Sequence, residues 1–233
     1  MDCGVAAPQT AVASPTGNFL AYFYYGESDS TKKETSAAAW DVAAHEFTHR
    51  VSIAKVKWEE SSNYSEANAI SEAYSDILGE YFENKLQWKF GEDEFRQSGQ
   101  YSRDLSCSPS SGKAKNPYDD GYYYYNYKTY LNEKSYLSHY NQYIGPHNAG
   151  TILSHAACLM HKAGLPANLA REIWFTSMDY LNTGADRATF SNSRTAVLTA
   201  ADKVFSKKSL SSSDKKKYKK YITDAFDAVG ITG

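Results

Sequence analysis

His45-Glu46-Phe47-Thr48-His49 is the segment from which the chemistry of this chain can be inferred. On a helix, two histidines four residues apart project from one face, one turn apart, so both rings can reach a single zinc ion at about 2.0–2.1 Å. Glu46 follows His45 by one position and points beside the ion, where a carboxylate can take a proton from a metal-bound water. The segment therefore predicts a zinc site with its own general base.

The surrounding residues provide the helix that this interpretation needs. Residues 36–49 are rich in Ala and contain neither Gly nor Pro, which favours a helix. A second helix is predicted from about Ser65 to Glu83, because apolar residues recur there at helical spacing. Glu72 and Asp76 lie four residues apart and therefore share a face of that second helix.

These two acidic residues suit a metal site. One can bind the ion, and the other can accept the second ring N–H of a zinc-bound histidine, which fixes the orientation of that ring; Asp76 is placed one turn from Glu72 for the second task. A pair of acidic residues on a helix is otherwise most often a solvated face. Beside a helix that carries the two histidines, the metal-site interpretation is favoured.

Two blocks of sequence, residues 40–51 around the histidines and residues 69–79 around Glu72, resemble the catalytic core of the thermolysin family of neutral zinc endopeptidases. Three further segments are similar to that family: residues 24–27, 88–93 and 225–231. The resemblance runs over most of residues 18–233 in the order of the family.

The resemblance implies that His45, His49 and Glu72 hold one zinc ion, with water in the open fourth position. Glu46 is then the general base, which accepts the proton of the water and later delivers it to the leaving amine. His147 matches the oxyanion-stabilising histidine of the family. The implied activity is an endopeptidase that cuts polypeptides, with a preference for hydrophobic residues after the cut bond.

Some matches depart from the family pattern. In the family one residue usually separates this histidine from an asparagine, whereas here Asn148 follows His147 directly. Asn141 and Gln142 stand where the family has an aspartate that orients the histidine. The competing candidate, His155, lies in an apolar run, where a histidine is more often a satisfied core group.

Three residues are candidates for substrate binding. Arg103 matches the arginine that in the family supports the pocket for the side chain after the cut bond. The planar guanidinium suits this role, since its donors can bind a backbone carbonyl and a buried carboxylate together. The alternative is a surface arginine. Tyr64 lies near the position of a phenol that helps to hold the oxyanion. Asn18 is the nearest candidate for the asparagine that aligns the substrate.

Calcium is also implied by the resemblance, in which Asp41, Glu83 and Glu92 match acidic ligands. Gln87 and Lys89 stand where the family supplies further acidic residues, and a hard cation tolerates a nearby ammonium group poorly. The sequence predicts at most one calcium ion, with Lys89 forming a salt bridge to Glu83 or Glu92 in place of a second.

The expected fold is mainly α, an α+β zincin with a short N-terminal β piece, a zinc-binding helix and a C-terminal helical bundle lobe. Residues 1–60 are expected to hold the end of an N-terminal lobe with the zinc helix, and residues 61–233 the helical lobe. The Tyr-rich segment 118–143 is interpreted as a packed loop that covers the expected active-site cleft. Helices are predicted at roughly 36–53, 65–85, 148–163, 168–181, 187–206 and 213–228.

Composition narrows the class of protein. The 233 residues carry a net charge of −2, so there is no electrostatic case for nucleic acid as a partner. No apolar run is long enough to span a membrane, and residues 1–17 lack the features of a signal peptide. The resemblance nevertheless suggests a secreted monomer. Because only three cysteines are present, we expect that disulfides do not organise the fold.

Two functions remain open at this point. The first is the zinc endopeptidase described above. The second is a binding or scaffold domain that keeps zinc for stability without catalysis, which is motivated by the altered surroundings of His147. Structural zinc sites normally have four protein ligands, and only three are evident here, which favours the enzyme.

Overall fold

The structure is a computed structural model that describes residues 11–13, 20–22, 39–56, 58, 65–94, 101–107, 112–115, 121–181 and 188–232. Within these residues the chain is mainly helical with a few short strands, which confirms the predicted fold class. The elements in chain order are β1 (Ala11–Ala13), β2 (Leu20–Tyr22), α1 (Trp40–Val56), α2 (Glu66–Glu83), β3 (Lys89–Phe90), β4 (Arg103–Asp104), β5 (Lys113–Lys115), β6 (Tyr122–Tyr124), α3 (Tyr127–Ser138), α4 (Pro146–Lys162), α5 (Ala167–Ser177), α6 (Phe190–Lys207) and α7 (Ser212–Ala228). Single 3₁₀ turns lie at Glu92–Glu94 and Met178–Tyr180.

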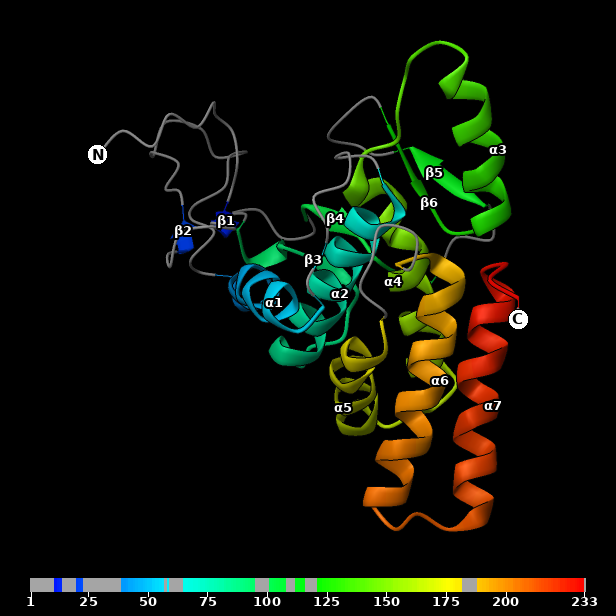
Figure 1. Cartoon of the computed structure of the whole chain (residues 1–233). Coiled ribbons are helices and arrows are strands. Elements are labelled where there is room, and N and C mark those ends of the chain that lie inside the picture. Colours follow the sequence, from blue (N-terminus) through cyan, green and yellow to red (C-terminus); the bar gives the residue numbers. More distant parts are fainter. Residues whose placement is uncertain are drawn as a thin grey trace.

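Helix α2 is the centre of the fold. It packs against α1 on one side and against α4 on another, and it also contacts α5 (Figure 1). Its Ala69, Ile70, Ala73 and Ile77 recur at helical spacing and are fully buried, as the apolar periodicity predicts. The helix begins where the Ser65 hydroxyl accepts a hydrogen bond from the Asn68 amide, so the side chain satisfies a backbone donor that the first turn leaves free.

A glycine permits the close approach of α4 to α2. A Cβ atom on Gly150 would lie 2.8 Å from the carbonyl oxygen of Ala69 and 3.2 Å from the amide nitrogen of Ala73. The contact therefore needs a residue without a side chain, and the position of α4 against α2 depends on it.

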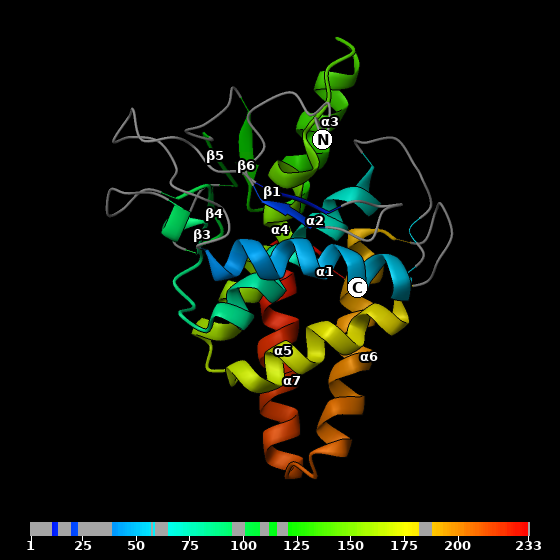
Figure 2. The same cartoon turned by 90° about the vertical axis from the view of Figure 1, so that its left-hand side faces the viewer.

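The C-terminal helices complete the core. Helices α6 and α7 lie side by side as a long pair, and α5 crosses in front of them when the molecule is turned (Figures 1 and 2). At the N-terminal end of α6, Glu66 of α2 accepts hydrogen bonds from the Tyr127 hydroxyl at 3.0 Å and from the Phe190 amide at 3.1 Å. One carboxylate thus joins the starts of α2, α3 and α6.

The Tyr-rich segment was interpreted as a loop, but in the structure it contains a strand and a helix. Strand β6 pairs antiparallel with β5, and α3 follows it after Asn126, whose side chain accepts from the amides of Lys128 and Thr129. The helix was missed because it buries only Tyr130 and so lacks an apolar stripe.

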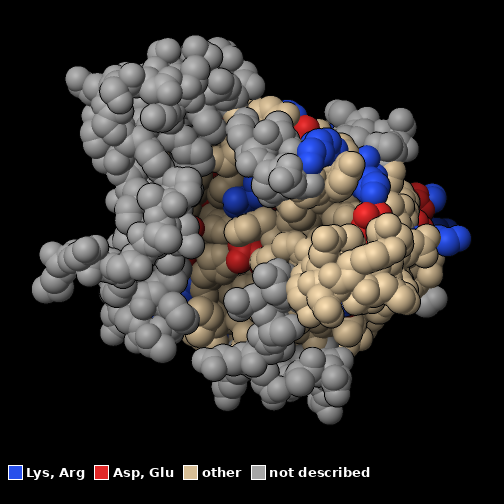
Figure 3. All heavy atoms as spheres, turned by 90° about the horizontal axis from the view of Figure 1, so that it is seen from above, with Lys and Arg blue, Asp and Glu red and all other residues tan. Residues whose placement is uncertain are grey.

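Seen from above (Figure 3), most of the described surface is uncharged, and its charged side chains form mixed clusters of both signs.

The structure contains a disulfide. The count of three cysteines had led to the expectation that disulfides do not organise the fold. Cys107, which follows β4, is bonded to Cys158 in α4 with their Cα atoms 5.6 Å apart. Cys3 and the predicted first turn of the zinc helix, residues 36–38, lie outside the described residues.

Among the described helices, none combines the length and apolar character that crossing a membrane requires.

We expect Gly150→Ala to destabilise the chain by about 1–3 kcal/mol, because the added methyl group forces α4 away from the backbone of α2. Urea unfolding followed by circular dichroism measures the change. Gly145→Ala is the matched control, since the nearest atom to its new Cβ, in Asn148, lies 4.0 Å away. Equal stability of the two variants would contradict the proposed close contact.

Candidate metal centre

Helices α1 and α2 bring two imidazoles and a carboxylate together. The Nε2 atoms of His45 and His49 lie 3.0 Å apart, and Oε2 of Glu72 lies 3.3 Å from the first and 3.4 Å from the second. The three ligand atoms come from positions one helical turn apart on α1 and from the facing side of α2. Oε2 of Glu72 is shielded from solvent, so the carboxylate faces the two rings and not water.

These distances fit a divalent ion. Four tetrahedral ligands at the usual zinc bond lengths of about 2.0–2.1 Å are separated from one another by about 3.3–3.4 Å. The observed separations of 3.0, 3.3 and 3.4 Å bracket that value without any rearrangement of the helices. Two imidazoles and one carboxylate are also a donor set typical of zinc. The residues present therefore fit this metal.

Asp76 and Arg103 hold the far side of His45. Nδ1 of His45 donates to Oδ1 of Asp76 at 2.7 Å, and the guanidinium of Arg103 donates to both oxygens of Asp76 at 2.5 and 3.1 Å. Burial alone would raise the pKa of Asp76, but the Arg103 charge and then the His45 hydrogen bond lower it to about 2. The carboxylate is thus ionised at any physiological pH and fixes which nitrogen of His45 faces Glu72.

The same contacts change the proton affinities of His45 and Glu72. Burial alone would lower the pKa of His45, but the hydrogen bonds to Asp76 and Glu72 raise it to about 9 in the metal-free chain. Burial alone would raise the pKa of Glu72, yet the charges of His147 and His49 hold it well below its ordinary value. The centre therefore keeps its two carboxylates ionised and attracts positive charge.

His147 lies at the open side of the centre. It is in the first turn of α4, its Nδ1 is 3.0 Å from Oε2 of Glu72, and its side chain is 48% exposed. His147 is thus within reach of the centre and also of solvent. His155, further along α4, donates from Nδ1 to the carbonyl oxygen of Ser106 and is buried, as expected for a core histidine.

The remaining predicted site residues are placed as follows. Glu46 lies on α1 beside His45 and is 8% exposed. Arg103 binds the buried carboxylate of Asp76, as its planar fork allows, and it is not a surface arginine. Tyr64 and Asn18 lie outside the described residues, so their predicted roles stay predictions.

Two contact residues were not found from the sequence. The Phe90 ring lies 5.2 Å from the His45 ring and 4.0 Å beneath the Arg103 guanidinium, so it forms the apolar wall on which both rest. The Ser71 hydroxyl lies 3.3 Å from Nδ1 of His49. Ser71 precedes Glu72 directly in the sequence, and this position next to a candidate ligand is the signal that could have identified it.

A second group of acidic residues lies at the start of α1 and the end of α2. Carboxylate oxygens of Asp41, Glu83 and Glu92 approach within 4.8 Å of one another. Burial and then the charges of Glu83 and Glu92 outweigh two backbone hydrogen bonds and raise the pKa of Asp41 to about 7. Oε2 of Glu83 and Oε2 of Glu92 are buried without a hydrogen-bond donor among the described residues. Oxygen-only groups of this kind suit a hard cation such as calcium.

The ammonium group beside these acids belongs to Lys85 and not, as predicted, to Lys89. Nζ of Lys85 lies 2.8 Å from both Glu83 and Glu92. The predicted pairing of Lys89 is wrong because β3 and β4 place it opposite Asp104, with which it forms a salt bridge at 2.5 Å. Strand register, which the sequence does not reveal, decides its partner.

A separate apolar groove of about 830 Å³ runs along α1, α2 and α5. The exposed rings of Trp40, Phe47, Phe82 and Phe175 line it, and neither His45 nor His49 does. It is therefore not the cavity of the metal centre.

The fold and the centre together match a known class of protein. Residues 60–231 match the family profile described as the thermolysin metallopeptidase alpha-helical domain. The chain therefore belongs to the thermolysin metallopeptidase family, which confirms the resemblance found in the sequence.

Two curated relatives agree with this family. Bacillolysin of Bacillus amyloliquefaciens is 26% identical over 211 residues, which cover 89% of this chain and 34% of the relative. Neutral protease B of Bacillus subtilis (strain 168) is 27% identical over 222 residues, covering 89% of this chain and 35% of the relative. The chain thus spans about a third of the length of these relatives.

Glu80, next to the acidic group, generates a pH prediction. Oε2 of this fully buried residue accepts from the Trp88 amide at 3.0 Å, while Oε1 has no hydrogen-bond donor among the described residues. Burial and then the Asp41 charge raise its pKa well above 4.5. The folded chain therefore prefers the protonated form; this stabilisation is complete below pH 4.5 and is lost as the pH rises through the folded pKa.

In Glu80→Gln the acceptor for Trp88 remains but no charge forms. We expect the free energy of unfolding of the metal-stripped variant, relative to the wild type, to increase from pH 5 to pH 8. Urea unfolding at several pH values measures this difference. The control is Asp224→Asn, whose carboxylate is exposed on α7. A difference between Glu80→Gln and wild type that does not vary with pH would contradict the raised pKa.

Proposed function

We propose that the chain is the helical part of a zinc-dependent endopeptidase, with His45, His49 and Glu72 as the zinc ligands. The observation that carries this proposal is the separation of the three ligand atoms, 3.0 to 3.4 Å, which suits tetrahedral zinc. Membership in a metallopeptidase family supports it. When bound, zinc supplies a Lewis acid that polarises the scissile carbonyl and lowers the pKa of a water molecule toward about 7.

The residues of the chain then have separate roles in hydrolysis. Glu46, beside His45 on α1, accepts the proton of the attacking water and returns it to the leaving amine. His147 stands at the open, solvent-facing side, where a donor can stabilise the charge that develops on the substrate oxygen. Asp76 holds the His45 ring in the orientation that directs Nε2 toward Glu72.

One observation favours the second candidate, a zinc-stabilised binding or scaffold domain without catalysis. Nδ1 of His147 approaches Oε2 of Glu72 to 3.0 Å, so His147 could act as a fourth ligand and close the site. The exposure of His147 and the presence of Glu46 at the position of a general base favour the open, catalytic arrangement. A quenched-peptide assay with and without chelator, together with zinc analysis, separates the two.

Further parts of the proposal rest on the family. We expect polypeptide substrates, a preference for hydrophobic residues after the cut bond with Arg103 at that pocket, a monomeric chain and an extracellular location. The acidic group of Asp41, Glu83 and Glu92 holds at most one calcium ion, since Lys85 already contributes a positive charge beside it. Calorimetric titration of the metal-stripped chain that showed two tight calcium sites would contradict this count.

Glu46→Gln tests the general base. We expect the variant to keep one zinc ion and to lose about 10²–10⁴-fold in kcat, because Gln cannot accept the proton. Elemental analysis measures the zinc, and hydrolysis of a quenched peptide measures kcat. Glu133→Gln is the control and should retain activity. It removes a carboxylate on α3 that is paired with Lys113 of β5. Retained turnover in Glu46→Gln would remove this residue from its proposed role.

Asp76→Asn tests the support of His45. We expect zinc affinity to fall by about 10–100-fold, because the neutral amide holds the imidazole less firmly. Competition with a chromogenic chelator measures the affinity, and far-ultraviolet circular dichroism shows whether the variant is folded. A folded variant with wild-type affinity would argue against the proposed role of Asp76.

A further inference from the structure

The segment from Tyr101 to Cys107 brings Arg103 to the metal centre. On its N-terminal side it is held by a two-residue pairing of β4 with β3, in which the Ser102 amide donates to the Phe90 carbonyl at 2.7 Å. The Leu105 amide donates to the Trp88 carbonyl at 3.0 Å, and the Leu105 side chain is fully buried. A ladder this short provides few hydrogen bonds to fix the direction of Arg103.

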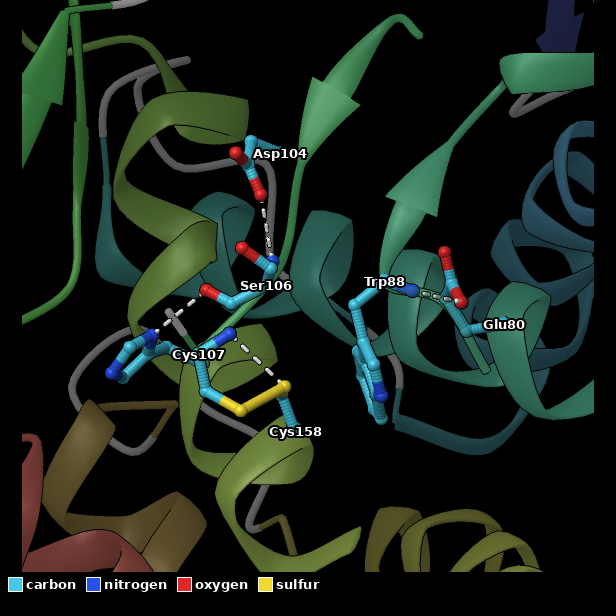
Figure 4. The surroundings of a disulfide bond; sticks show 7 residues. Glu80, Trp88, Asp104, Ser106, Cys107 and Cys158 are labelled. Atoms are coloured by element: carbon cyan, nitrogen blue, oxygen red, sulfur yellow. Dashed lines mark hydrogen bonds between the residues drawn. A yellow bond between two sulfur atoms is a disulfide. The ribbon is translucent and has the colours of Figure 1, made fainter. Parts of the chain in front are cut away.

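The C-terminal side of the same segment is fastened to α4. Cys107 forms its disulfide with the buried Cys158, and the Cys107 amide donates to Sγ of Cys158 at 3.0 Å (Figure 4). Ser106 accepts a hydrogen bond through its carbonyl oxygen from His155 of α4 at 3.1 Å. The disulfide is thus the covalent attachment of this segment to α4, the helix whose first turn carries His147.

Arg103 transmits this attachment to the centre. It lies four residues before Cys107, its guanidinium holds both oxygens of Asp76, and Asp76 holds His45. The path from the disulfide to the zinc-facing ring is therefore one short segment and two charge-assisted hydrogen-bonded contacts.

We propose that the Cys107–Cys158 disulfide is a positioning element of the metal centre, which keeps Arg103 on Asp76 and thereby orients His45 for zinc. This inference rests on the proposed function, because it assigns a role toward the same ion. The alternative is a purely structural disulfide, which stabilises the folded chain by restricting the unfolded one without affecting the centre. The two roles differ in whether metal affinity changes when the bond is removed from a folded chain.

The experiment uses a Cys3→Ala parent, so that no unpaired thiol of the chain competes for metal. Cys107→Ala/Cys158→Ala removes the disulfide, and zinc affinity is measured by competition with a chelator alongside urea unfolding. We expect the affinity to fall about tenfold, as for other losses of support behind a ligand. Arg103→Gln in the parent should give a similar loss.

Combining the substitutions tests the path. If the disulfide acts through Arg103, the triple variant loses no more affinity than Arg103→Gln alone, which is the non-additivity expected of one connected unit. Ile222→Ala is the matched control: this fully buried residue of α7 should lower stability and leave zinc affinity unchanged.

Each outcome decides between the roles. Parent affinity in a folded Cys107→Ala/Cys158→Ala variant, or fully additive losses in the triple variant, would overturn the inference and leave the proposed function intact. A parent that binds no zinc would overturn both.

If the disulfide-free variant does not fold, the zinc-loaded parent is reduced directly. A water-soluble phosphine gives two electrons to the disulfide, takes oxygen from water and leaves two thiols on the protein. Iodoacetamide then alkylates both thiols, with loss of iodide, so that neither competes for zinc. Release of zinc to the chelator should then be about tenfold faster than from the oxidised parent. An unchanged release rate would overturn the inference.

Discussion

The burial of the Asp76 carboxylate between two helices is the constraint on which the centre depends. A charge that is removed from water must be matched by charged partners close by, and His45 and Arg103 supply them. The two partners come from α1 and from the segment of β4, so satisfying one carboxylate fixes three parts of the chain relative to one another. The orientation of the His45 ring, with Nε2 toward Glu72, is a consequence of this arrangement.

Much of the centre could be predicted from local sequence spacing. His45 and His49, like Glu72 and Asp76, lie one turn apart on helices whose existence follows from composition and apolar periodicity. Spacing alone could not show that the two helices face each other. The resemblance to a known family supplied that step, and the buried apolar face of α2 explains it, since the helix must pack against α1 and α4 to bury those residues.

The parts that were predicted wrongly depend on contacts between distant residues. The partner of Lys89 is set by the register of β3 against β4, and the acidic group instead receives Lys85. Cys107 and Cys158 are 51 positions apart, and nothing in a count of three cysteines indicates that they meet. Helix α3 buries a single tyrosine, so a search for an apolar stripe finds no helix there.

The disulfide between Cys107 and Cys158 has one more consequence for a chain of a peptidase family. A backbone cut anywhere between these two residues, for example in the exposed tyrosine-bearing end of α3, leaves both pieces covalently joined. Such a nicked molecule would keep Arg103 and His147 on one assembly and would migrate as a single species until its thiols were regenerated. Tolerance of a backbone cut is thereby built into the part of the chain that the disulfide closes, residues 107 to 158.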